Sequence, residues 1–150
     1  KRTYLNEKIF YIKAAFLDKK SEMYFREMPT YLGGANYLSE NMQSGDSYLI
    51  ETTTIDDWVN ENDIASLSYI KTDIEGSDYL ALKGATNSIS KFLPDLAICI
   101  YHKNDHMYLI PELIKSINSE YNLWFDHYTD SLDSSVLYCS TKLPSKKIFE

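Results

Sequence analysis

The sequence has few cysteines, and they form no metal-binding or disulfide-rich pattern. Its 150 residues contain two, Cys99 and Cys139, and no C-x-x-C motif. Both lie in apolar runs, which indicates two buried free thiols in a reducing compartment, because disulfides are rare in cytosolic chains. A disulfide between the two is the alternative. We therefore expect a cytoplasmic protein.

Long apolar runs and clusters of basic residues are also absent. No stretch approaches the roughly 18 apolar residues of a membrane span, and the N-terminus lacks the apolar segment of a signal peptide. The chain has 15 Lys and Arg residues against 22 Asp and Glu residues, a net charge of −7. This balance disfavours a nucleic-acid partner. We expect a soluble protein without a membrane or nucleic-acid partner, and with a small-molecule or carbohydrate substrate.

Apolar patterns along the chain predict a series of strands. The expected strands are residues 8–16, 18–26 after an initial turn, 48–54, 67–73, 95–102, 123–129 and 134–141. Residues 27–47 show no sustained period, so they are either a substrate loop or disordered. The run at 95–102 is too continuously apolar for a half-exposed sheet, which indicates burial on both faces.

Helical patterns lie between several of these strands. Asp56 or Asp57 is expected to cap a short helix, and apolar spacings of three and four predict a helix over 77–93 that Gly84 divides in two. A third helix is expected to begin with Pro111 at its first position. The alternation predicts an α/β fold in one domain, residues 1–150. Its sheet is doubly wound and mostly parallel, with an antiparallel C-terminal strand pair.

Two acidic residues follow a predicted central strand in the stretch "SYIKTDIEGSDYLALKGA". Ligands of parallel sheets collect at the carboxyl ends of the strands. Asp73 and Glu75 lie at such an end, and His102 lies at the end of the strand expected beside it. A carboxylate can accept a hydroxyl proton, and histidine is the natural base near neutral pH. Lys71 should share a strand face with Asp73, so an ion pair is expected there.

Other roles for these three side chains remain open at this point. Asp73 could cap the strand end, Glu75 could be a first-turn helix acid, and His102 could bond a nearby carbonyl. A metal held by the three is a further alternative, since carboxylate and imidazole ligands suit magnesium, manganese or zinc. The H-x-x-x-H spacing of His102 and His106 gives one ligand face only on a helix, and this stretch is predicted as a loop.

Several of these segments resemble a known family. The stretches "TTTIDDW", "IKTDIEGSDYLALKGA", "LPDLAICIYHK" and "LIPELIK" are similar to the C-terminal half of the FkbM-type methyltransferases. The most specific part is the K-x-D-x-E-G block at Lys71, Asp73, Glu75 and Gly76, followed by L-K-G-A at 82–85. Members of that family are S-adenosylmethionine-dependent O-methyltransferases with a class I, Rossmann-like fold.

The resemblance implies roles for particular residues. Residues 8–16 would be the third strand of the family's sheet, which ends near the adenine, so Ala14 and Ala15, together with Asp73, are the expected cofactor-binding residues. Asp73, Glu75 and His102 are the expected catalytic residues. The implied cofactor is S-adenosylmethionine, without a metal. The implied acceptor is a hydroxyl of a sugar, a polysaccharide or a small metabolite.

One departure from the family limits what the chain is expected to do alone. The glycine-rich turn after the family's first strand and the acid after its second strand have no counterpart, and Gly33-Gly34 is not that turn. We therefore expect the downstream portion of a methyltransferase domain, lacking the first two strands. Alone it should be inactive, and oligomeric or marginally stable. The alternatives are a non-catalytic remnant or assembly module of the same fold, and a metal-dependent hydrolase.

Overall fold

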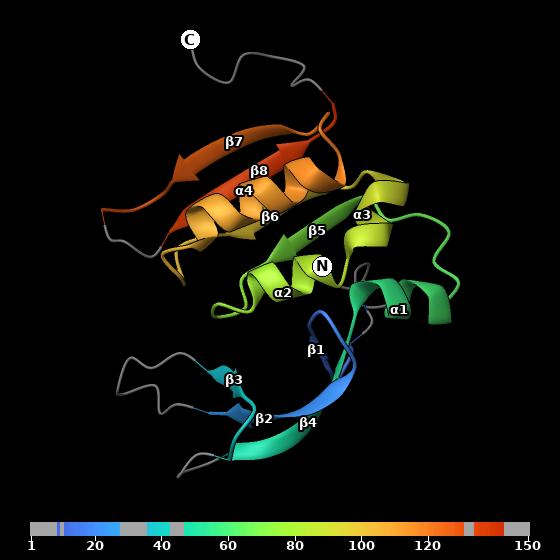
Figure 1. Ribbon diagram of the computed structural model, residues 1–150, viewed down its shortest axis with the longest axis vertical. Coiled ribbons are helices and arrows are strands. Elements are labelled where there is room, and N and C mark those ends of the chain that lie inside the picture. Colours follow the sequence, from blue (N-terminus) through green and yellow to red (C-terminus); the bar gives the residue numbers. More distant parts are fainter. Residues whose placement is uncertain (1–8, 10, 28–35, 43–46, 131–133, 143–150) are drawn as a thin grey trace, which may run out of the picture.

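The computed structural model describes residues 9, 11–27, 36–42, 47–130 and 134–142, and these form two sheets of four strands with helices packed around them (Figure 1). The first sheet has the order β1 (Ala15–Phe16), β4 (Ser47–Thr53), β2 (Ser21–Arg26) and β3 (Tyr37–Ser39). The second has the order β5 (Tyr69–Thr72), β6 (Asp95–Cys99), β8 (Ser135–Ser140) and β7 (Asn122–His127). The fold is therefore mixed α/β, as the sequence predicts.

The first sheet differs most from the sequence prediction. Strand β1 has two residues, where the apolar run predicts a strand over 8–16, and it pairs in parallel with β4. Strand β2 pairs antiparallel with both β4 and β3. The aperiodic region 27–47 thus contributes a strand, β3, because the backbone of β2 provides hydrogen-bond partners for it. Gly33 and Gly34 lie outside the described residues.

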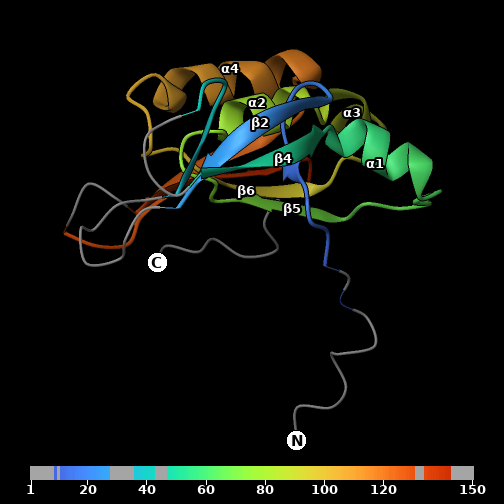
Figure 2. The same ribbon diagram turned by 90° about the horizontal axis from the view of Figure 1, so that it is seen from below.

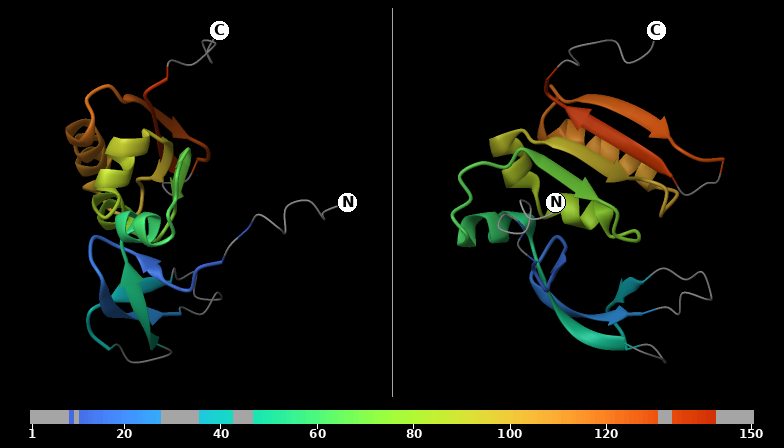
Figure 3. Two further views of the ribbon diagram at one scale, coloured as in Figure 1. Left: turned by 90° about the vertical axis from the view of Figure 1, so that its right-hand side faces the viewer. Right: turned by 180° about the vertical axis from the view of Figure 1, so that it is seen from behind.

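The second sheet combines parallel and antiparallel pairs. Strands β5 and β6 are parallel, whereas β8 is antiparallel to both β6 and β7. This confirms the expected antiparallel pair at the end of the chain. The single, mostly parallel, doubly wound sheet is not observed in the described residues. Helices α2 (Asp78–Lys83), α3 (Thr86–Phe92) and α4 (His106–Ile117) lie on one face of the second sheet (Figures 2 and 3).

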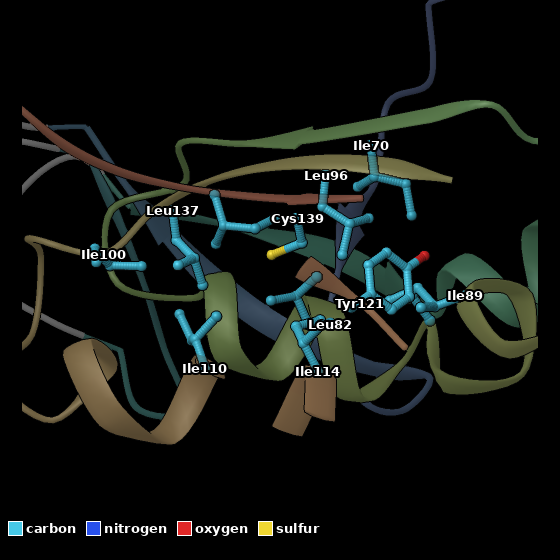
Figure 4. Close-up of a cluster of buried hydrophobic side chains, with 12 residues drawn as sticks. Ile70, Leu82, Ile89, Leu96, Ile100, Ile110, Ile114, Tyr121, Leu137 and Cys139 are labelled. Carbon is cyan, nitrogen blue, oxygen red and sulfur yellow. The ribbon is translucent and has the colours of Figure 1, made fainter. Parts of the chain in front are cut away.

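The core lies between the second sheet and these helices. Side chains from β5, β6 and β8 point toward those of α2 and α4 (Figure 4). The labelled members of the cluster are Ile70, Leu82, Ile89, Leu96, Ile100, Ile110, Ile114, Tyr121, Leu137 and Cys139. The buried Tyr121 hydroxyl donates to the Pro94 carbonyl at 2.8 Å, so the aromatic ring enters the core without an unpaired polar group.

Strand β6 and the two cysteines agree with the expectations from sequence. Residues Leu96 to Cys99 are all buried, which confirms that this strand is covered on both faces. Cys99 and Cys139 are free and buried. Burial raises the pKa of the Cys139 thiol to about 12 and, together with Asp73, that of Cys99 to about 11.

The helix ends correct two expectations. Helix α1 (Ile55–Glu61) is capped by Thr54, whose hydroxyl accepts the Asp57 N–H at 2.9 Å, so neither Asp56 nor Asp57 is the cap. Helix α4 begins at His106, and Pro111 therefore lies inside it. The Asp105 carbonyl accepts the N–H groups of the first turn, which starts the helix before the proline. In the described residues, no helix is long and apolar enough to cross a membrane.

Gly84 divides the predicted helix, as expected, and also lets the segment after β1 approach the junction of α2 and α3. It separates α2 from α3. A Cβ atom at this position would lie 2.0 Å from the backbone oxygen of Leu17, which follows β1. No side chain therefore fits here without moving the backbone of the first sheet away from α2.

Asp56, in helix α1, makes a second connection to the junction of α2 and α3. Its N–H donates to the Gly84 carbonyl at 2.9 Å. Its carboxylate accepts the backbone N–H groups of Asn87 at 2.9 Å and Ser88 at 2.7 Å. These are free donors in the first turn of α3, whose own N-cap is Ala85 and offers no side-chain acceptor. Asp56 of α1 thus caps a different helix.

We predict that Gly84→Ala lowers the free energy of unfolding by about 1–3 kcal/mol, because the added methyl group must displace backbone. Denaturant unfolding measures this change. Ser90→Ala on the exposed side of α3 is the control and should leave the stability within about 0.5 kcal/mol of the wild type. Equal stability of the two variants would show that the close approach at Leu17 is not required.

We predict that Asp56→Ala costs about 2 kcal/mol of folding free energy, because two charge-assisted hydrogen bonds to the α3 terminus are lost. Asp57→Ala is a matched control in the same helical turn. Its carboxylate is 43% exposed and lies 3.8 Å from Lys20 Nζ, a contact worth about 1 kcal/mol at most. Thermal unfolding of both variants tests the difference, and a similar loss in each would contradict the cross-helix cap.

Candidate functional site

A cleft of about 470 Å³ lies where the first sheet faces the end of β5. One wall comes from β1, β2, β3 and β4, and the other from β5, the turn after it and α2. Its lining is mostly apolar, and most of its polar side chains come from β5 and the turn after it. The lining residues are Ala14, Ala15, Phe16, Phe25, Asn36, Tyr37, Leu38, Ile50, Ile55, Ile70, Lys71, Thr72, Asp73, Ile74, Glu75, Ser77 and Ala81.

The structure brings the residues predicted from sequence to this one place. Ala14 and Ala15 line the cleft from the first sheet, and Asp73 and Glu75 line it from the second. His102, which follows β6, contacts the two acids from behind. Its Nε2 atom lies 3.3 Å from Glu75 Oε2 and 3.5 Å from Asp73 Oδ1. Asp73 and His102, 29 positions apart in sequence, thus meet after the ends of the parallel strands β5 and β6, and Ala15, 58 positions before Asp73, lies on the other wall of the cleft.

A tight turn after β5 aims the two acids at the cleft. Glu75 has φ of +53° and Gly76 has φ of +87°, so the chain reverses within two residues. A Cβ atom on Gly76 would lie 3.0 Å from Lys103 Cε and 3.6 Å from His102 Cβ. The positive φ is the reason for glycine here, since the flexible Lys103 side chain could move away from an added Cβ atom. Glu75 lies in this turn, ahead of α2, and is not a first-turn acid.

Asp73 is held as a carboxylate by its neighbours. Burial alone would raise its pKa, but hydrogen bonds from Cys99 and Tyr101 and the nearby Lys71 charge lower the pKa below its ordinary value. The Tyr101 hydroxyl donates to Asp73 Oδ1 at 3.1 Å, and Lys71 Nζ lies 3.5 Å from Oδ2, which confirms the expected ion pair. Burial and the same contact with Asp73 raise the pKa of Tyr101.

A third acid, Asp78, joins the group. Its Oδ2 atom lies 3.3 Å from His102 Nδ1, on the side of the ring opposite to Glu75. Asp78 is the first residue of α2, where an aspartate is an ordinary helix-start residue, and the sequence reading did not single it out. It is completely buried, unlike Asp73 and Glu75, which are 41% and 42% exposed. Asp78 is buried because of tertiary packing, and the residues around it in the sequence do not indicate this burial.

His106 does not extend this group into a metal site. It begins α4 and is buried, with its ring 6.5 Å from that of Tyr79. Burial lowers its pKa, although the Asp78 charge opposes the shift. In the part of the chain that the structure describes, no set of three His, Cys, Asp or Glu side chains is arranged to hold a metal ion. The hydrolase hypothesis therefore has no ligand set among these residues.

Comparisons with known proteins agree with the resemblance seen in the sequence. The family described as the methyltransferase FkbM domain matches residues 11–128. The crystal structure of a methyltransferase FkbM from Methylobacillus flagellatus KT is similar, with a TM-score of 0.68 and 26% sequence identity. The similarity covers 91% of this chain and 30% of that one, so the chain spans less than a third of that protein's length. No curated protein matches.

We predict that Tyr101→Phe raises the pKa of Asp73, because one of the donors that stabilise its charged form is lost. A carboxylate whose pKa is lowered in the fold stabilises it above the unfolded-state pKa of about 3.9, and this contribution disappears as the pH falls through the folded-state value. The variant should therefore lose less stability between neutral pH and acid than the wild type. Carboxyl ¹³C NMR titration of Asp73 measures the shift directly.

Tyr128→Phe is the control for this titration. Tyr128 bonds Tyr138 through its hydroxyl at 2.7 Å, and Asp73 is not among the groups that affect its pKa. The control should leave the titration of Asp73 unchanged. An unaltered midpoint in Tyr101→Phe would mean that the 3.1 Å contact is not a hydrogen bond in solution.

Proposed function

This chain belongs to the FkbM methyltransferase family, and on that premise we propose that it forms part of an S-adenosylmethionine-dependent O-methyltransferase. The proposed acceptor is a hydroxyl of a sugar, a polysaccharide or a small metabolite. The observation that carries the proposal is the meeting of Ala14, Ala15, Asp73 and Glu75 around one cleft, with His102 behind the acids. The family match covers residues 11–128, which include all five.

The cleft suits the proposed cofactor in size and in charge. Its volume of about 470 Å³ lies within the range of small-molecule sites. The short side chains of Ala14 and Ala15 leave apolar space beside the first sheet, which favours a flat organic ring. S-adenosylmethionine supplies a methyl group on a positively charged sulfur, and Asp73 provides a carboxylate that favours a cation.

The acids and the histidine have complementary roles in this proposal. Asp73 stays ionised because its neighbours lower its pKa, so it supplies a fixed negative charge at the end of β5. His102 Nε2 and Glu75 Oε2 lie 3.3 Å apart, and an acceptor hydroxyl that approaches this pair from the side could lose its proton to the imidazole. The chain would mainly hold the reacting groups together, and positioning of that kind accounts for much of the rate of such reactions.

The proposed acceptor end of the cleft is aromatic. Phe25 and Tyr37 line it from β2 and β3. Tyr37 is fixed by the Arg26 guanidinium, which donates to its hydroxyl at 2.9 Å. Flat aromatic faces beside polar side chains suit a sugar ring, and the net charge of −7 disfavours a strongly anionic acceptor. The same part of the cleft would accept a small aromatic alcohol.

Calorimetric titration with S-adenosylhomocysteine tests the cofactor assignment. It is carried out on the 150-residue chain, and also on a longer form where the gene encodes residues upstream of Lys1. Saturable binding to either form supports the proposal. Binding to neither would favour the non-catalytic remnant instead.

We predict that Asp73→Asn lowers the rate of methyl transfer about 100-fold or more, because the fixed charge facing the cleft is removed. The melting temperature should change little, since the side chain is 41% exposed. Glu120→Gln, in the loop before β7, is the control and should retain full activity. Transfer is measured with isotopically labelled donor, and a fully active Asp73→Asn would remove this residue from the site.

A further inference from the structure

Asp78 poses a physical problem that the proposed roles of Asp73, Glu75 and His102 leave unsolved. Its side chain is 0% exposed, and neither oxygen has a hydrogen-bond partner in the described part of the chain. A buried carboxylate without a partner is among the most costly arrangements in a protein. Truncation to an apolar residue would remove that cost, so the retained acid needs a compensating interaction.

The nearest compensating group is the imidazole of His102. Asp78 Oδ2 lies 3.3 Å from His102 Nδ1, although the alignment falls short of a hydrogen bond. The histidine side chain is only 8% exposed, so water has little access to the contact. Catalytic hydrogen bonds are often long or poorly aligned before the substrate binds, and a small ring rotation would complete this one.

The surroundings decide which ring nitrogen should carry the proton in the neutral imidazole. Nε2 faces Glu75 and Asp73, but Glu75 is 42% exposed to solvent and Asp73 already receives the Tyr101 hydroxyl. Asp78 is 0% exposed, and neither of its oxygens accepts a hydrogen bond in the described part of the chain. A lone pair on Nδ1 would repel its oxygen, so the Nδ1–H form is the one that relieves the buried charge.

We propose that Asp78 is a positioning residue that accepts the Nδ1 proton of His102 and thereby turns the Nε2 lone pair toward Glu75 and the cleft. The catalytic role of this arrangement rests on the proposed function. The hydrogen bond between Asp78 and His102 is independent of it. Asp78 does not line the cleft, and it acts only through its contact with the histidine.

The arrangement gives the proton transfer a defined path. The acceptor O–H bond would break, a new N–H bond would form at Nε2, and the oxygen would keep the electron pair with which it bonds the methyl carbon. The donor would supply that carbon, whose bond to sulfur breaks with its electron pair remaining on the departing sulfur. The ring then carries protons on both nitrogens, and the Asp78 carboxylate offsets its positive charge inside the fold. With the proton on Nε2 instead, the ring would have no lone pair for the acceptor.

Nitrogen-15 NMR of the histidine rings tests the hydrogen bond on the 150-residue chain. The chain has three histidines, so His102→Gln identifies the signals of this ring. At a pH where the ring is neutral, we expect the Nδ1–H form in the wild type. The Nε2–H form in the wild type would overturn the proposal, and this result needs no folded Asp78 variant.

Asp78→Asn and Asp78→Glu extend the test. The amide can donate its own N–H to Nδ1, so Asp78→Asn should convert His102 to the Nε2–H form, and Asp78→Glu should restore the Nδ1–H form at least in part. Asp105→Asn, the same change at the start of α4, is the matched control and should leave the His102 form unaltered. An unchanged ring in a folded Asp78→Asn would also overturn the proposal.

Activity separates this inference from the proposed function. Where methyl transfer is measured, Asp78→Asn should lower kcat about 100-fold or more with little change in KM, because the base is held in the wrong form while the cleft is intact. Absence of transfer and of S-adenosylhomocysteine binding, together with the Nδ1–H form of His102, would reject the proposed function alone. Transfer that is unaffected by Asp78→Asn would reject the catalytic role of Asp78 alone.

Discussion

The close contact between the segment after β1 and Gly84, which lies between α2 and α3, is the constraint on which the cleft depends. The backbone after β1 lies so near Gly84 that a Cβ atom would come within 2.0 Å of the Leu17 oxygen. Asp56 secures the same junction by capping α3 from α1. With these contacts in place, Ala14 and Ala15 face the end of β5 across a space of about 470 Å³. Without them, the two walls of the cleft would have no fixed distance.

The polar end of the cleft shows how burial and charge are balanced. Asp73 and Glu75 keep partial contact with solvent, whereas Asp78 has none. The two partly exposed acids are available to a ligand, because keeping their charge in contact with solvent costs little free energy. The buried acid has the imidazole of His102 3.3 Å away, and neither of its oxygens forms a hydrogen bond within the described residues. His102 therefore lies between the buried Asp78 and the more exposed Asp73 and Glu75. It is a neighbour of the buried charge and also a candidate base.

The apolar pattern of the sequence accounts for the second sheet better than for the first. Its four strands and its antiparallel end agree with apolar runs that the sequence displays clearly, whereas the order β5, β6, β8, β7 comes from the structure. The first sheet includes a strand of two residues and one of three. Elements this short carry too few residues for a pattern, and they exist because β2 and β4 provide backbone partners.

The sequence by itself determined the class of fold, the division of a helix at Gly84, the burial of β6 and the convergence of Asp73, Glu75 and His102. These features follow from spacing, from glycine geometry and from the rule that parallel strands end at one edge. Only the tertiary structure decided that there are two sheets in the described residues, that Asp56 caps a distant helix and that Asp78 is buried against His102. Each of these depends on groups far apart in the chain, and local patterns contain no information about which distant group will supply a missing partner.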